Sequence, residues 1–130
     1  METLENNNSF NDIIEIISDP ITNETKEIDR SEDFKNGNIL LVHSNDAILK
    51  LPFNTNMSGK IVRISSAYDK EGLLNVGATR INAPEKMWFF ENGVKYNSIL
   101  ISREFIELIG YGTEDVFFGY VVLSRNNFMT

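Results

Sequence analysis

The chain has 130 residues, 12 Lys and Arg side chains against 19 Asp and Glu side chains, and a formal net charge of −7. This length predicts one domain, and a hydrophobic content of 42% is enough to form a core. The absence of cysteine excludes a disulfide scaffold and thiolate metal sites. The acidic balance argues against a general nucleic-acid or anionic-membrane binder, and no apolar run approaches the ~20 residues of a membrane span.

The negative charge is concentrated in the first 35 residues. That segment holds ten acidic and three basic residues, whereas residues 36–130 hold nine of each. Such asymmetry is typical of an interaction tail, although a solvated terminus has the same composition. We therefore expect an extended acidic arm over residues 1–37 and a neutral body over residues 38–130.

One helix is predicted within the arm, over residues 10–18. Ser9 has the position of an N-cap with Asp12 three residues later, and Pro20 ends the pattern. A helix of this length is shorter than the ~12–15 residues that are stable alone. Its apolar face is therefore expected to anchor the arm in another protein or, as the alternative, on the chain's own body. That face consists of Phe10, Ile13, Ile14 and Ile17.

The body is predicted to consist of short β-strands. Runs rich in Ile, Val and aromatic residues alternate with turn residues at spacings typical of an all-β sandwich or barrel. The first two runs are close enough to form a hairpin, and the run at 105–109 fits either a strand or a helical turn. The predicted fold is a small antiparallel, jelly-roll-like β-sandwich with a short N-terminal helix on an acidic arm. The expected strands lie at 38–42, 47–51, 60–65, 73–76, 79–82, 87–90, 94–96, 98–101, 105–109 and 117–124.

Residues suited to catalysis are sparse. His43 is the only histidine, so a Ser/His/Asp triad would need it. Glu104 and Glu107 could form a glycosidase pair, but this spacing is also common on solvent faces. Asp69 and Glu71 occupy a predicted turn that lacks the ligand density of a calcium loop. We therefore expect no enzyme activity, no catalytic or metal-binding residue and no cofactor.

Two aromatic clusters are the best candidates for a contact surface. Neighbouring residues of a strand point to opposite faces, so at least one residue of each cluster should face away from the core. Aromatic side chains are enriched in subunit interfaces and in surfaces that bind carbohydrate, and the neutral body favours self-association. We expect self-association or receptor contact through Trp88, Phe89, Phe90, Phe117, Phe118 and Tyr120.

The order of strands and turns between residues 38 and 124 resembles a C-terminal β-sandwich module of tailed-phage fibre, head-fibre and appendage proteins. In that module a hydrophobic strand, a polar turn and a strand ending in Leu-Pro precede Gly-Lys and a β-branched strand. A strand of the Gly-Tyr-Val-Val kind closes the module, and here residues 83–98 are an insertion. The matching segments span about two-thirds of the chain and are 39–42, 48–52, 59–64, 74–77, 80–82, 105–109 and 119–123.

The resemblance implies a homotrimeric virion structural protein, a fibre or capsid decoration assembled in the host cytoplasm. Residues 1–35 would bind the capsid or another virion protein, and the insertion at 83–98 would contact a neighbour or a receptor such as a host surface glycan. Neither nucleic-acid binding nor membrane insertion is expected. The alternative is a soluble binding module, either a glycan-binding domain or an acidic inhibitor of a host protein. A DNA-mimicking inhibitor needs acids spread over a rigid surface, and here the body sums to zero.

Overall fold

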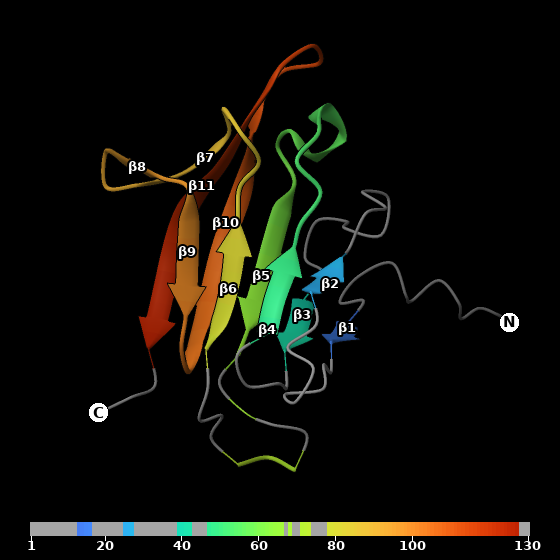
Figure 1. The fold of residues 1–130 in the computed structure, drawn as a ribbon, viewed down its shortest axis with the longest axis vertical. Helices are drawn as coiled ribbons and strands as arrows, with labels where there is room; N and C mark the ends of the chain where they lie inside the picture. The colour runs from blue at the N-terminus through green and yellow to red at the C-terminus, as the bar shows by residue number, and fades with distance from the viewer. Residues whose placement is uncertain are drawn as a thin grey trace, which may run out of the picture.

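The computed structural model describes residues 13–16, 25–27, 39–42, 47–66, 68, 71–73 and 78–127. They form two β-sheets that stack as a sandwich (Figure 1). A short 3-10 turn, η3 (Thr55–Met57), lies between the fourth and fifth strands. The predicted all-β sandwich is therefore confirmed. The strand predicted at 73–76 lies for the most part outside the described residues.

The two sheets differ in size. The larger sheet has seven strands in the order β1-β3-β5-β10-β11-β7-β8. Their bounds are β1 (Ile13–Ile16), β3 (Ile39–Val42), β5 (Ile61–Ser65), β7 (Trp88–Glu91), β8 (Val94–Tyr96), β10 (Glu104–Gly112) and β11 (Phe117–Asn127). The smaller sheet has four strands in the order β2-β4-β6-β9. Their bounds are β2 (Thr25–Glu27), β4 (Ala47–Lys50), β6 (Thr79–Asn82) and β9 (Ser98–Ile101).

From β1 to β6 the chain alternates between the sheets. Each time the chain returns to a sheet, its new strand lies parallel to the previous strand of that sheet. Strands β1, β3 and β5 are therefore parallel neighbours in one sheet, and β2, β4 and β6 are parallel neighbours in the other. The predicted hairpin of 38–42 with 47–51 is wrong, because β3 and β4 belong to different sheets. An alternating apolar pattern shows which face of a strand is buried but not which strand lies beside it.

Antiparallel pairing involves the later strands. β10 pairs with β5 on one side and with β11 on the other, and β6–β9 and β7–β8 are also antiparallel. β11 and β7, in contrast, are parallel. The sheets are thus mixed, which corrects the antiparallel, jelly-roll-like arrangement predicted from the sequence. Parallel neighbours need a long crossover connection, and the passage through the opposite sheet supplies it.

Two strands come from the segment predicted to be a separate arm. Most of the helix predicted over residues 10–18 lies outside the described residues. In the part that is described, Ile13–Ile16, the helix prediction is wrong, because these residues form strand β1. Isoleucine is β-branched and favours extended backbone, and a short apolar run fits both helical and strand periods. β1 pairs with β3 and β2 with β4. Both sheets therefore extend into the acidic segment.

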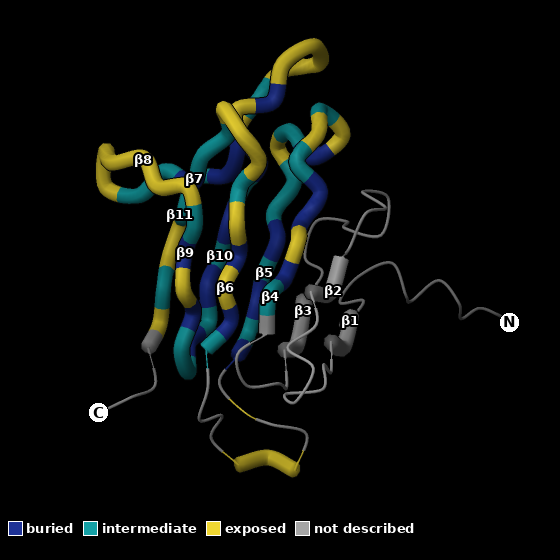
Figure 2. The backbone as a smooth tube through the Cα atoms, viewed as in Figure 1, coloured by how far each residue is buried: buried dark blue, intermediate teal, exposed yellow. Residues whose placement is uncertain are grey.

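The core lies between the sheets and is built from alternating strand positions. Along β10 the buried residues are every second one, which confirms a strand at 105–109 rather than a helical turn. Figure 2 shows these buried positions running along the strands of the sandwich, whereas the β8 segment is exposed. The buried aliphatic side chains include Leu49, Val62, Ile64, Ile81, Ile99, Ile101, Ile106 and Leu108.

Aromatic side chains close the core beside the loop that follows β4. The ring of Phe53 makes edge-to-face contacts with Phe89, Phe117 and Tyr120, at centroid distances of 5.5, 6.1 and 5.0 Å. The hydroxyl group of Tyr120 donates a hydrogen bond of 2.5 Å to the carbonyl oxygen of Pro52. Burial of this phenol raises the pKa of Tyr120 far above its usual range.

Replacing Tyr120 with phenylalanine is expected to lower stability by about 1–2 kcal/mol at neutral pH, because the Pro52 carbonyl loses its donor. The same change should also remove the part of the loss of stability at alkaline pH that Tyr120 causes. The folded chain keeps the Tyr120 proton, whereas the unfolded chain releases it above a pKa of about 10. The contribution of Tyr120 to stability is therefore complete below pH ~10 and falls by up to about 1.4 kcal/mol per pH unit above it.

Urea unfolding of the parent and Tyr120→Phe chains at several pH values checks this expectation. The parent should lose stability more steeply than the variant above pH ~10, so that the difference between them narrows. If the free energy of unfolding fell equally in both proteins as the pH rises, the Tyr120 phenol would not titrate differently in the folded and unfolded states.

Arg125, which forms ion pairs within the larger sheet, also links the two sheets at the β9–β10 turn. The Arg125 guanidinium of β11 donates to both carboxylate oxygens of buried Glu104, at 2.9 and 2.7 Å, and contacts Glu91 at 3.3 Å. It also donates to the carbonyl oxygen of Leu100 in β9, at 2.9 Å. The hydrogen bonds to Glu104 raise the pKa of Arg125 above its usual range, although burial of the guanidinium opposes this. The fixed charge therefore holds β9 of the smaller sheet against the larger one.

Candidate functional site

The candidate site is an exposed aromatic surface on the outer side of the seven-stranded sheet. We call it the aromatic face and define it as Trp88 and Phe90 of β7, Tyr111 of β10 and Phe118 of β11. The side chains of Tyr111 and Phe118 remain 50% and 41% exposed. Cross-strand pairing brings the residues together, since β11 lies between β10 and β7. Apolar exposure of this kind on three adjacent strands is typical of a contact surface.

The aromatic rings contact one another across the strands. Phe90 and Tyr111 lie edge to face with centroids 5.4 Å apart, and Tyr111 and Phe118 lie 5.2 Å apart at 40°. The Lys95 ammonium group of β8 is 4.6 Å from the centre of the Trp88 ring, within the range of a cation–π contact. These contacts restrict the rotamers of the side chains, so a partner would meet a surface that is already ordered.

Gly119 makes this arrangement possible. It pairs with Trp88 on one side and with Tyr111 on the other. A β-carbon at Gly119 would lie 1.8 Å from the Trp88 carbonyl oxygen, and the backbone φ of +138° is one that side chains disfavour. The glycine therefore allows β7 to approach β11 closely enough to bring its two outward aromatic residues beside Tyr111 and Phe118.

A β-bulge explains how β11 serves both the core and the aromatic face. The register of β10 with β11 shifts between Tyr111 and Gly112, which pair with Gly119 and Phe117 respectively, so Phe118 is the extra residue. Phe117 and Tyr120 are consequently both buried, although on a regular strand two residues three positions apart would point to opposite faces of the sheet. Phe118 is left on the outer side.

One pair of charged groups lies on the same side of the sheet as the aromatic face. Arg63 of β5 and Glu107 of β10 lie opposite each other on the outer side and form a 2.7 Å ion pair. The Ser124 hydroxyl group donates to the same Glu107 carboxylate at 3.4 Å. A partner that covered this ion pair would not leave either of its two charges buried alone.

Three of the six aromatic residues predicted as contacts lie on the outer side, namely Trp88, Phe90 and Phe118. The prediction is wrong for Phe89, Phe117 and Tyr120, which are buried in the core and have no surface to offer a partner. Their burial follows from the register and the bulge, neither of which can be read from composition. Tyr111 was missed, although its position between Gly110 and Gly112 is the kind of signal that marks a side chain beside a closely packed backbone.

The predicted anchoring residues are only partly described. Ile13 and Ile14 lie in β1, whose backbone pairs with β3. Phe10 and Ile17 lie outside the described residues. The sequence left open whether this segment docks on another protein or on the chain's own body. The pairing of β1 with β3 is a backbone contact with the chain's own sheet.

The catalytic alternatives gain no support from the geometry. Glu104 and Glu107 lie on opposite sides of β10, because residues three apart on a strand have opposite orientations. Glu104 is bound by Arg125 and Glu107 by Arg63. His43 and Asp69 lie outside the described residues. Among the described residues, no three His, Asp or Glu side chains are grouped as metal ligands, and no helix is long and apolar enough to cross a membrane.

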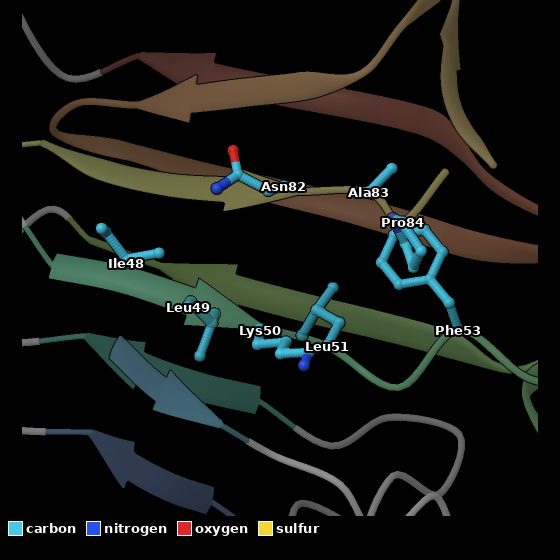
Figure 3. A pocket seen from close by; sticks show the side chains of 8 residues that line it. All are labelled: Ile48, Leu49, Lys50, Leu51, Phe53, Asn82, Ala83 and Pro84. Carbon is cyan, nitrogen blue, oxygen red and sulfur yellow. The ribbon is translucent and has the colours of Figure 1, made fainter. Parts of the chain in front are cut away.

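A separate hollow of about 400 Å³ opens on the smaller sheet. It forms where β4 and β6 continue past their last paired residues, Leu49 and Ile81. Figure 3 shows Phe53 and Pro84 at one end of the hollow, with Ile48 toward the other end. The full lining is Ile48, Leu49, Lys50, Leu51, Phe53, Asn82, Ala83 and Pro84. This volume is at the lower end for a small-molecule site, and the lining is mainly apolar.

The chain matches no protein family, no curated protein and no solved structure.

Proposed function

We propose that the protein is a non-enzymatic structural protein of a bacteriophage virion, a homotrimeric fibre or capsid decoration. The observation that carries the proposal is the aromatic face, an apolar surface whose rings hold one another in place across three strands. Such a surface suits protein–protein assembly better than the binding of a charged substrate. The resemblance of residues 38–124 to phage fibre and appendage modules supplies the virion context.

The N-terminal segment is proposed as the attachment to the capsid or to another virion protein. Among the strands that the structure describes, β1 and β2 end their sheets. An edge strand offers backbone N–H and C=O groups that a strand of another protein can pair with. Attachment through the edge of β1 would combine this pairing with the acidic character of residues 1–35.

The second candidate is a soluble glycan-binding module. The hollow on the smaller sheet favours it, because an aromatic side chain and an amide, Phe53 and Asn82, line the same cavity. A host surface glycan bound there would also be compatible with a virion fibre. The acidic-inhibitor alternative gains no observation of this kind.

The virion proposal is tested with phage particles from the genome that encodes the chain. We expect the protein to remain with particles through a density gradient and to be detected in them by mass spectrometry. A variant lacking residues 1–20 loses strand β1 but should still unfold cooperatively through its remaining strands, as followed by circular dichroism, and should not join the particles. Particles without the protein, or normal incorporation of the shortened variant, would contradict the virion role or the attachment role respectively.

A further inference from the structure

The two strands that border the hollow on the smaller sheet are both followed by proline. β4 leads into Leu51 and Pro52, and β6 leads into Ala83 and Pro84. Continuing the register in which β4 and β6 pair would place the two prolines opposite each other. Proline lacks the N–H group that a ladder of hydrogen bonds between strands requires. The ladder therefore ends at this level, and the hollow lies where the strands part (Figure 3).

The end of the ladder leaves three backbone groups directed toward the gap between β4 and β6. The Ala83 N–H donates to the Asn97 carbonyl oxygen beside β9, at 2.7 Å, so the carbonyl of the preceding residue, Asn82, points toward β4. In a parallel ladder its donor would be the Leu51 N–H, but the pairing ends before that bond. The Leu51 carbonyl would accept next from Pro84, which has no N–H. Among the described residues, these three groups make no other backbone hydrogen bond.

Burial makes these groups a site for a ligand. Leu51 is only 3% exposed, and a buried backbone group without a partner is costly. The hollow has a volume of about 400 Å³, the share of about 13 water molecules at ~30 Å³ each. It can therefore hold a molecule the size of one sugar ring with a small substituent.

We propose that the hollow binds the acetamido group of an N-acetylated sugar. The carbonyl and N–H of a trans amide point in opposite directions, so the ligand carbonyl accepts from the Leu51 N–H while the ligand N–H donates to the Asn82 carbonyl oxygen. A sugar hydroxyl group donates to the Leu51 carbonyl oxygen. The methyl group packs on the apolar lining. The proposal deepens the glycan-binding candidate described above and rests on it.

The chemistry of the lining favours this ligand over an anion or a peptide. Two of the three backbone groups are carbonyl oxygens, which attract donors and repel an anion. Of the lining residues, Lys50 alone is charged, and it is exposed to water. Phe53 and Pro84 at one end offer apolar surface to the ring of a sugar. An extended peptide would need a longer groove, because it pairs along the length of a strand.

Titration of the full chain with N-acetylglucosamine, followed by nitrogen-15 NMR, tests the proposal. A ligand of about 15 heavy atoms typically binds with a dissociation constant of about 1 mM. We expect the amide resonance of Leu51 to shift downfield as its proton gains an acceptor, together with shifts at the other lining residues. Glucose has a hydroxyl group in place of the acetamido group, so it should bind about tenfold more weakly or worse.

A variant that fills the hollow provides the second arm of the test. Asn82→Tyr places a large side chain at an exposed lining position of β6, and tyrosine favours strands. It should weaken binding of N-acetylglucosamine at least tenfold. The matched control is Leu100→Tyr, at a position that is 48% exposed on neighbouring β9 and outside the lining, and it should bind as the parent does. Unfolding midpoints are compared first, and Ile48→Phe replaces Asn82→Tyr if that variant does not fold.

Other outcomes overturn the inference. It fails if the Leu51 resonance does not move, if the filled variant binds as the parent does, or if glucose binds equally well. Equal binding of the two sugars at the hollow would reject recognition of the acetamido group but keep the glycan-binding candidate, whereas no shift of the lining with either sugar would reject the hollow as a sugar site. Tighter binding of N-acetylalanine methylamide would assign the hollow to a peptide. The particle experiment tests the virion role independently of all these results.

Discussion

Replacing Gly119 with alanine is expected to lower the free energy of unfolding by about 4 kcal/mol or more, enough to abolish folding of a marginally stable domain. The added β-carbon would lie 1.8 Å from the Trp88 carbonyl oxygen and 2.8 Å from two further Trp88 backbone atoms. A backbone cannot rotate away as a side chain can. β7 would have to leave β11, and Phe89 would lose its place in the core.

Gly93→Ala is the matched control for this substitution. Gly93 also has a positive φ, +80°, but a β-carbon there would meet no atom within 4 Å. Its cost should be limited to the backbone preference, about 1–2 kcal/mol. Urea denaturation followed by circular dichroism compares the two variants. Equal effects would show that close contact with Trp88 does not limit position 119.

Replacing Glu104 with glutamine is expected to cost about 3 kcal/mol, because the guanidinium of Arg125 would lose its main partner while remaining half-buried. Glu107→Gln is the matched control on the same strand. It removes the carboxylate of a pair that lies on the outer side and is more accessible to water. That change should cost about 1 kcal/mol or less.

A double replacement distinguishes the ion pair from simple packing. The double variant Glu104→Met, Arg125→Met removes both charges. We therefore expect it to be less destabilised than the variant with Glu104→Met alone or the variant with Arg125→Met alone. Thermal unfolding of the four proteins gives the coupling between the two positions. Additive losses would contradict a direct dependence of Arg125 on Glu104.

Strand positions were largely predictable from the sequence, whereas strand partners were not. The segments 79–82, 94–96 and 98–101 form strands with the expected bounds, because β-branched residues and turn residues are local signals. Pairing depends on which strands meet across the folded chain. The parallel neighbours β3 and β5 are separated in sequence by β4 of the opposite sheet, and no local pattern records that.

The candidate site, too, was predictable where it depends on alternation along a strand and not where it depends on strand pairing. Alternation required that some residues of each aromatic cluster face outward, and Trp88, Phe90 and Phe118 do so. It could not separate Phe117 from Phe118 reliably, because the bulge at Phe118 interrupts the period of two. Tyr111 joins the aromatic face only through the pairing of β10 with β11, which depends on residues distant in sequence.

The late position of β11 in the chain has a consequence during synthesis. β11 pairs with both β10 and β7 and supplies Tyr120, whose hydroxyl group reaches Pro52 across 68 residues. Phe89 is therefore made about 30 residues before the side chains that enclose it. At ~5–20 residues per second on the ribosome, the half-made sandwich exposes this apolar surface for roughly 2–6 s. Nearby chains made at the same time would meet it unburied, so the core must close before copies of the chain can associate correctly.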